Sequence, residues 1–266
     1  MKVSVRYLFV MVLAVLASVV VADMAVNFPA GVNISGVVGA PGYEQDYWLN
    51  TANQPDSWGI TYNLNDETNT ATGAVMDFWA SAFGSQAGFS DDPMAARMLE
   101  RGIGTCWTDY DPDPAHQDPA TFRVINIPYQ SYNVVVYFGS RELTDYVQKV
   151  TANGSSLYAR VPANTGYAQM GYRQIPNTST SNLEANTPYG NYMVFEGFTS
   201  STLTVRADWA GGVGTLPRAY ISGFQIIENN CVGAEHPVGD LNGDCKINFF
   251  DLGIIASGWL LEGAAE

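Results

Sequence analysis

Five side chains that carry oxygen ligands stand at regular spacing near the carboxyl end of the chain: Asp240, Asn242, Asp244, Asn248 and Asp251. They occupy positions 1, 3, 5, 9 and 12 of a short segment, and Lys246 at position 7 would contribute its backbone carbonyl. Calcium takes six to eight oxygen ligands and is wrapped by loops with this spacing. The segment therefore predicts a Ca²⁺ site.

The residues around this loop predict the element that would hold it. Ile247 is the apolar residue at position 8, which pins such a loop to the helix that follows. Leu252, Ile255, Ala256 and Trp259 then fall on one face of a helix. The alternative is a solvated turn, rich in Asp and Asn, before an ordinary amphipathic helix. The complete spacing favours calcium.

The segment Gly239–Leu261, GDLNGDCKINFFDLGIIASGWLL, resembles one repeat of a type I dockerin. It is also similar to the tails of secreted proteins from planctomycete-type bacteria. The resemblance implies a small α-helical, EF-hand-like dockerin module that attaches its carrier to a cohesin-like or cell-surface partner. Two departures matter: a dockerin carries two such repeats, and Cys245 stands at position 6, where these loops prefer Gly.

Three cysteines allow at most one disulfide within the chain. Cys231 and Cys245 bracket the start of the calcium segment, and a disulfide between them is a hypothesis that export would permit. Cys106 would then be left as a buried thiol.

The first 22 residues have the composition of a signal peptide. Lys2 and Arg6 precede the apolar run Leu8–Val21, and small residues place the cleavage before Asp23. The alternative is a retained membrane anchor, for which the run is short. We expect a secreted protein, extracellular or at the cell surface, that has no membrane segment after signal removal. Its formal charge of -14 argues against nucleic acid as a partner.

Residues 23–229 consist of short strand patterns separated by turn residues, so we expect a mainly β domain, a jelly-roll or galactose-binding-like β-sandwich. We predict that Asn133–Phe138 is a central strand and that Thr202–Arg206 has one wet face. We interpret residues 230–239 as a linker and residues 240–266 as the dockerin-like module. The clearest predicted strands are Ser57–Leu64, Ala74–Ala80, Thr121–Ile127, Tyr132–Phe138, Tyr192–Phe195, Thr202–Ala207 and Ala219–Ile227. The polar segment Asn177–Asn182 is predicted to be disordered.

Aromatic side chains in polar loops are the candidates for binding a sugar, because ring faces stack on the apolar side of a pyranose. These candidates are Tyr110, Tyr172, Tyr189 and Trp209, whereas Trp58, Trp79 and Trp107, which lie in strands, are expected in the core. The segments Ala219–Glu228 and Tyr132–Ser140 are also similar to strands of galactose-binding-like and malectin-like sandwiches. This weaker resemblance implies a lectin-type fold.

Patterns that mark an enzyme are scarce. The chain has two histidines and no nucleophile elbow, zinc motif or phosphate-binding glycine loop. We therefore expect no catalytic residues, and predict a secreted, non-catalytic carbohydrate-binding protein that takes part in polysaccharide catabolism by binding a glycan. One alternative is a structural or adhesive surface protein. Another is a glycoside-cleaving enzyme that uses unmarked carboxylates among Asp77, Asp91, Asp92, Glu100 and Asp109.

Overall fold

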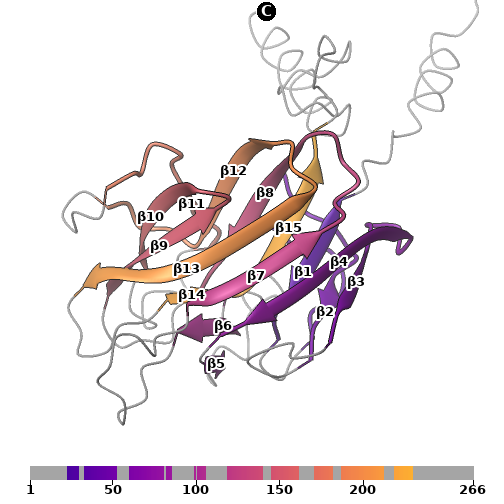
Figure 1. Ribbon diagram of the computed structural model, residues 1–266. Helices are drawn as coiled ribbons and strands as arrows, with labels where there is room; N and C mark the ends of the chain where they lie inside the picture. The colour runs from indigo at the N-terminus through magenta and orange to yellow at the C-terminus, as the bar shows by residue number, and fades with distance from the viewer. Residues whose placement is uncertain are drawn as a thin grey trace, which may run out of the picture. The chain divides into compact units, whose positions relative to one another are not determined.

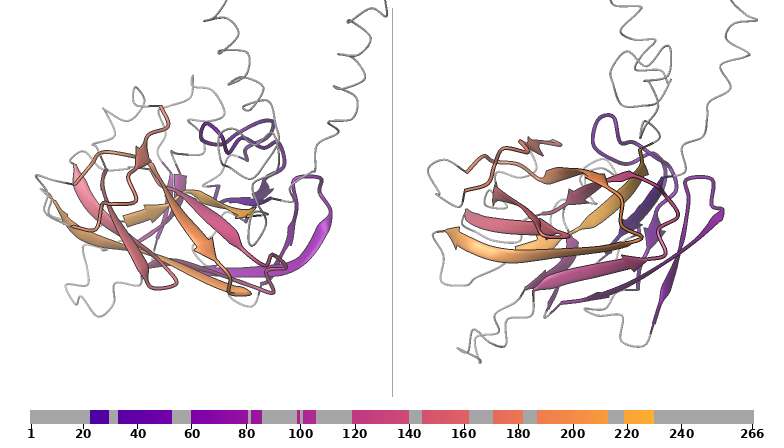
Figure 2. Two further views of the ribbon diagram at one scale, coloured as in Figure 1. Left: turned by 90° about the horizontal axis from the view of Figure 1, so that it is seen from above. Right: turned by 45° about the horizontal axis from the view of Figure 1, so that its top comes forward.

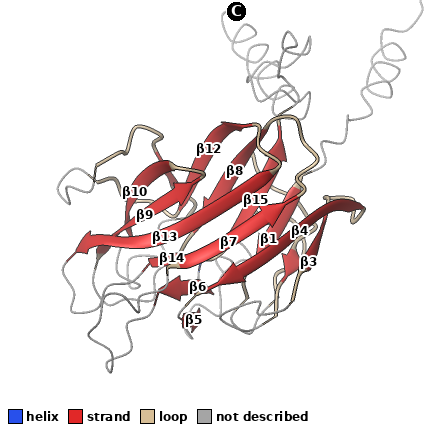
Figure 3. Cartoon of the chain, in the orientation of Figure 1, coloured by secondary structure: helices blue, strands red, loops and turns tan. Residues whose placement is uncertain are grey.

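A computed structural model describes residues 23–29, 33–52, 60–80, 82–85, 99, 101–105, 119–139, 145–161, 171–181, 187–212 and 219–229. The described strands belong to one compact unit, Ala22–Glu228, and the rest of the chain forms a second unit. Strands dominate the described residues (Figure 3).

The first of two six-stranded sheets forms one layer of the domain (Figure 1). Its strands, in spatial order, are β11 (Gln174–Ile175), β12 (Tyr192–Phe198), β8 (Tyr132–Tyr137), β15 (Gly223–Glu228), β1 (Met24–Asn27) and β2 (Leu49–Asn50). The outer pairs β11–β12 and β1–β2 are parallel, and the inner pairs are antiparallel.

The second six-stranded sheet faces the first (Figure 2). Its strands, in spatial order, are β10 (Ser155–Val161), β9 (Tyr146–Ala152), β13 (Thr202–Gly212), β7 (Ala120–Ile125), β4 (Ala71–Trp79) and β3 (Tyr62–Asn65). A three-stranded sheet completes the set with β14 (Ala219–Ile221), β6 (Arg101–Thr105) and β5 (Ala82–Ser85).

Phenyl rings join the two six-stranded sheets. Phe122 of β7 stacks on Phe224 of β15, with ring centroids 3.9 Å apart and planes 9° apart. Phe28 contacts both rings and also meets Phe78 of β4 edge-on at 5.1 Å. All four side chains are buried. Because buried apolar area is the main favourable term in folding, this layer explains why the two sheets pack face to face as a sandwich.

The segment that precedes β2 covers the outer face of the first sheet at Tyr137. The Tyr137 hydroxyl donates to Gln225 Oε1 at 2.5 Å and accepts from the Ala40 amide at 3.0 Å. Trp48 packs against the Tyr137 ring at 6.1 Å and donates its indole N–H to the Gln45 carbonyl. Both faces of β8 are therefore buried, which confirms the prediction of a central strand over Asn133–Phe138.

The mainly β prediction is confirmed, and most predicted strands have a counterpart. Thr202–Arg206 alternates between exposed and buried residues, as predicted for a strand with one wet face. The predicted strand Ser57–Leu64 is wrong in its bounds: β3 begins at Tyr62, and residues 53–59 lie outside the described part. The pattern also missed β9 and β10, whose turn is formed by Asn153 and Gly154, both at positive φ.

The predicted disorder over Asn177–Asn182 is wrong for its described residues, 177–181. Tyr158 donates its amide to the Ser179 carbonyl at 2.9 Å, and the Ser179 hydroxyl donates to the Tyr158 carbonyl at 2.7 Å. Polar composition does not prevent order here because edge strand β10 supplies hydrogen-bond partners.

The signal peptide, the linker, the dockerin-like module and all three cysteines lie outside the described residues. The signal peptide, calcium loop and Cys231–Cys245 disulfide therefore stay predictions. Within the described ranges, the structure contains no helix long and apolar enough to cross a membrane.

Candidate functional site

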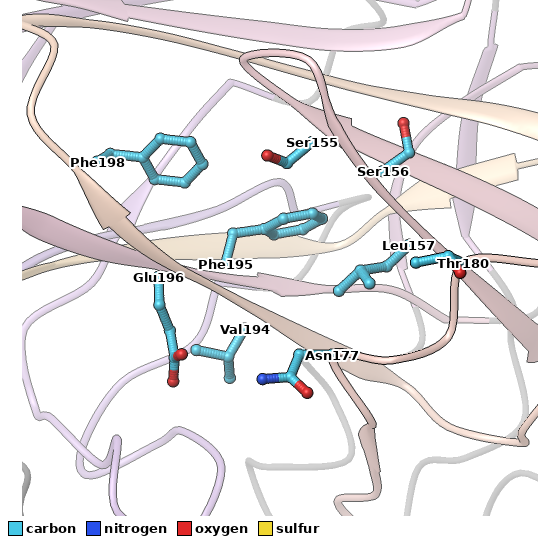
Figure 4. A pocket seen from close by; sticks show the side chains of 9 residues that line it. All are labelled: Ser155, Ser156, Leu157, Asn177, Thr180, Val194, Phe195, Glu196 and Phe198. Atoms are coloured by element: carbon cyan, nitrogen blue, oxygen red, sulfur yellow. The ribbon is translucent and has the colours of Figure 1, made fainter.

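A pocket of about 400 Å³ lies between β10, at the edge of the second sheet, and β12 of the first sheet (Figure 4). It arises because β11 pairs with β12 only at Tyr192 and Met193. The chain after β11 then turns toward β10, where Ser179 bonds to Tyr158. The stretch of β12 from Val194 onward therefore has no paired strand on that side among the described residues.

A β-bulge shapes the β12 wall of the pocket. Phe195 pairs with Val134 and Phe198 pairs with Tyr132, so Glu196 and Gly197 both stand opposite Asn133. Gly197 has a φ of 75°, and its amide donates to Asn133 Oδ1 at 2.9 Å. A bulge of this kind redirects side chains locally. Here it holds Glu196 at the pocket with its side chain exposed.

The pocket combines apolar surface with groups that form hydrogen bonds. The apolar lining is Leu157, Val194, Phe195 and Phe198, and the polar lining is Ser155, Ser156, Asn177, Thr180 and Glu196. In Figure 4 the ring of Phe195 lies on one side of β12, and the side chains of Val194 and Glu196 lie on the other. The volume is within the range of small-molecule sites, roughly 300–1,000 Å³. Such a lining suits a ring that has one apolar face and hydroxyl groups at its edge.

Tyr172 does not reach this pocket. Its ring contacts Tyr137 at 5.9 Å and Tyr192 at 6.3 Å, both edge-on, in the aromatic cluster on the first sheet. Burial raises the pKa of Tyr172, and a bond to the Gly39 backbone partly offsets this rise. The ring is therefore largely engaged in packing.

Tyr189 lies beside β10 but toward the other end of that strand, where it forms a bridge with Arg160. The Arg160 guanidinium covers one face of the ring at 4.7 Å, and Arg160 Nη2 also pairs with Asp145 at 3.2 Å. The Tyr189 hydroxyl donates to Asp145. One face of this ring is thus already occupied by a cation.

Trp209 is the most accessible of the described candidates, at 43% exposed. It continues the inward-facing series Val205 and Ala207 on β13. It is exposed because β7 begins opposite Ala207, at Ala120, so no β7 residue pairs with Trp209. The structure does not bring Tyr172, Tyr189 and Trp209 together at one site, and Tyr110 lies outside the described residues. Their role in binding remains a prediction.

Trp79 corrects one expectation about the core. It was predicted to be buried, but it lies at the end of β4 and is 36% exposed. Its position opposite Thr121 of β7 places it on the outer face of the second sheet. A strand position alone therefore does not determine burial, because each strand has two faces.

No family model matches this sequence. No curated protein matches it either. Among solved structures, one match is an exo-beta-1,3-galactanase from Phanerochaete chrysosporium with galactose, at 14% identity and a TM-score of 0.26. The match covers 55% of this chain and 25% of the galactanase chain. This similarity is too weak to carry an argument, so the functional inference depends on the geometry of the domain.

Asp77 is the one hydrolysis candidate in the described part, and it is engaged by a cation. Arg123 Nε donates to Asp77 Oδ1 at 3.1 Å, and a second bond joins Nη2 to Oδ2. The hydrogen bonds that Arg123 donates to Asp77 raise the pKa of Arg123. Asp91, Asp92, Glu100 and Asp109 lie outside the described residues.

The predicted calcium ligands also lie outside the described residues. They are Asp240, Asn242, Asp244, Lys246, Asn248 and Asp251. Within the described part, the structure shows no group of three or more His, Cys, Asp or Glu side chains that could hold a metal ion.

The pocket was missed because β10, which carries three of its residues, was not predicted, and because Asn177 and Thr180 lie in the polar segment for which no structure was expected. Ser155, Ser156 and Leu157 follow the Asn153-Gly154 pair, which is the strongest short-range signal of a two-residue hairpin turn. That pair would have located β9 and β10. No comparable local sequence signal marks the pocket itself, because Ser156 and Phe195 are far apart in the sequence and line the same pocket only in the folded chain.

Proposed function

We propose that this chain is a secreted, non-catalytic carbohydrate-binding protein. Its sandwich would take a jelly-roll, galactose-binding-like form, and its carboxy-terminal segment would be a dockerin-like calcium module for attachment in polysaccharide utilisation. The observation that carries the binding function is the pocket between β10 and β12, which is lined by two phenyl rings and by hydroxyl, amide and carboxylate groups.

The two kinds of lining would act on different parts of one sugar ring. Phe198, which is half-buried, offers most of the apolar surface against which the C–H face of a pyranose packs, because Phe195 and Leu157 are only 5% and 6% exposed. Asn177 and Thr180 can each donate and accept hydrogen bonds, as sugar hydroxyls require. The segment that carries them is fixed to β10 through Ser179, so these groups are positioned before a ligand arrives.

The charges at the pocket favour binding over hydrolysis. Glycoside hydrolysis in its common forms uses two carboxyl groups about 5–10 Å apart. Glu196 is the one carboxylate in the described lining. An adhesive role would instead be favoured by a large apolar surface patch, whereas among the described residues the exposed large apolar side chains are few, namely Val37, Ile60, Trp79, Ile125 and Trp209.

The attachment part of the proposal is supported by sequence alone. The loop Asp240–Asp251 has the oxygen spacing of a calcium loop, and the following residues have helical periodicity. The ion would be structural, since binding to the folded loop stabilises it. The resemblance to a single dockerin repeat makes a cohesin-like or cell-surface protein the proposed partner.

The test is retention of the purified protein on a panel of soluble and insoluble polysaccharides. Selective retention is expected, with no release of sugar. Asn177→Ala and Thr180→Val should each weaken it about two- to tenfold, the equivalent of one lost hydrogen bond. Thr204→Val, on the outer face of β13, is the matched control and should bind normally. Release of sugar would contradict the non-catalytic assignment, and loss of retention with Trp209→Ala alone would move the site to Trp209.

A further inference from the structure

A single residue sets the charge of the described pocket lining. Among the nine described side chains that line the pocket, Glu196 is the one that is ionisable, and none is Lys or Arg. Its carboxylate makes no hydrogen bond or ion pair with another described residue, in contrast to Asp77 and Asp208, which are paired with Arg123 and Arg206. A ligand in this pocket therefore meets one negative charge that no described residue compensates.

The bulge fixes where that charge stands. Gly197 adopts a positive φ and is tied to Asn133, so the backbone on the carboxyl side of Glu196 is held in one conformation. On the other side, Phe195 is 5% exposed and pairs with Val134. The backbone of Glu196 is therefore held between a buried ring and a constrained glycine, and its side chain lies on the same side of β12 as Val194 (Figure 4).

We propose that Glu196 makes the pocket selective for sugars that carry a free, protonated amino group, and against sugars that carry a carboxylate. This inference depends on the proposed carbohydrate binding and names the class of sugar. A carboxylate and an ammonium group within about 4 Å attract each other, and two carboxylates repel by a similar amount. The formal charge of -14 on the whole chain acts in the same direction.

The size of the effect follows from the exposure of Glu196. Exposed ion pairs contribute modestly, so an amine-bearing sugar should bind about two- to fivefold more tightly than its N-acetylated form. A uronic acid should bind weaker than the neutral sugar by a similar factor. The preference should shrink in high salt, because the Debye length falls from about 10 Å at 0.1 M to about 3 Å at 1 M.

The experiment compares glucosamine, N-acetylglucosamine and galacturonate oligomers of equal length, titrated into the wild-type protein at 50 mM and 500 mM salt. The wild type should prefer the amine form at low salt and lose most of that preference at high salt. Glu196→Gln keeps the size of the side chain and should bind all three within about twofold. Asp46→Asn removes an exposed charge outside the pocket lining and should keep the wild-type order.

Three outcomes would overturn the inference. The first is a wild-type preference for galacturonate, and the second is an amine preference that survives in Glu196→Gln. The third is binding of all three oligomers with equal affinity by the wild type, which would reject selectivity while leaving carbohydrate binding intact. Failure of all these oligomers and of the polysaccharide panel to bind would reject the proposed function itself.

Discussion

Tyrosines contribute to this domain as buried rings whose hydroxyls are paired, and Tyr132 illustrates the consequence. Its side chain is buried, its hydroxyl donates to the Ser200 carbonyl at 2.8 Å, and Phe198 of the pocket packs on its ring at 5.7 Å. Burial raises the pKa of Tyr132 to about 12. Burial raises the pKa of Tyr137, Tyr172 and Tyr192 as well. The protonated form of these residues is thus favoured by folding.

The sandwich should therefore lose stability in alkaline solution. A phenol whose pKa is higher in the folded state than in the unfolded state stabilises the fold fully below the unfolded value, near 10, and this stabilisation is lost as the pH rises toward the folded value. The free energy of unfolding, measured with urea from pH 8 to 11.5, should be flat at first and fall above about pH 10. Tyr132→Phe should show a smaller fall than the wild type. An equal fall in the variant would show that Tyr132 does not contribute.

The bulge in β12 is the element that places the pocket side chains. A residue other than Gly at the φ of Gly197 costs about 1–2 kcal/mol, although a Cβ there would meet no atom within 4 Å. Gly197→Ala should lower the free energy of unfolding by about that amount and weaken sugar binding. Gly197→Asn should be milder, because Asn tolerates the left-handed region better.

Urea denaturation and oligosaccharide titration of both glycine variants provide the measurement. We predict that the free energy of unfolding and the affinity for the oligosaccharide both decrease in the order wild type, Gly197→Asn, Gly197→Ala. If Gly197→Ala kept wild-type stability and affinity, the bulge would not be the constraint that positions Glu196.

Strands could be predicted from the sequence where the pattern is local. The apolar run Asn133–Phe138 and the alternating run Thr202–Arg206 both encode burial in neighbouring residues, so the structure contains β8 and β13 as expected. The Asn153-Gly154 pair is an equally local signal of a hairpin turn, but the strand prediction did not use it. The pocket could not be predicted, because it depends on β11 ending early and on β10 and β12 lying near each other.

The candidate aromatics show the same limit. Sequence context placed Trp209 in a polar loop, but this residue lies in β13 and is 43% exposed. It also placed Trp79 in the core, although Trp79 is 36% exposed. It could not foresee that Arg160 would cover Tyr189 or that Tyr172 would pack against Tyr137. Those contacts join residues from separate strands and loops, and no local pattern encodes them.

At the scale of the whole molecule, we propose that the chain consists of a sandwich that binds sugar and a calcium module for attachment. Calcium should raise the melting temperature of the carboxy-terminal segment. At a concentration 100-fold above its dissociation constant, it would stabilise the folded module by about 2.7 kcal/mol. Asp244→Ala should remove this effect and leave sugar binding by the sandwich unchanged. A thermal and proteolytic profile that is the same in calcium and in chelator would count against the calcium module.

The central claim is that the pocket between β10 and β12 is where a sugar binds. The most direct measurement is a nuclear magnetic resonance titration of the methyl and indole signals with an oligosaccharide that the protein retains. The account predicts that Leu157 and Val194 shift progressively and saturate, while the Trp209 indole stays unchanged. Shifts confined to Trp209, with Leu157 and Val194 unaffected, would contradict the account.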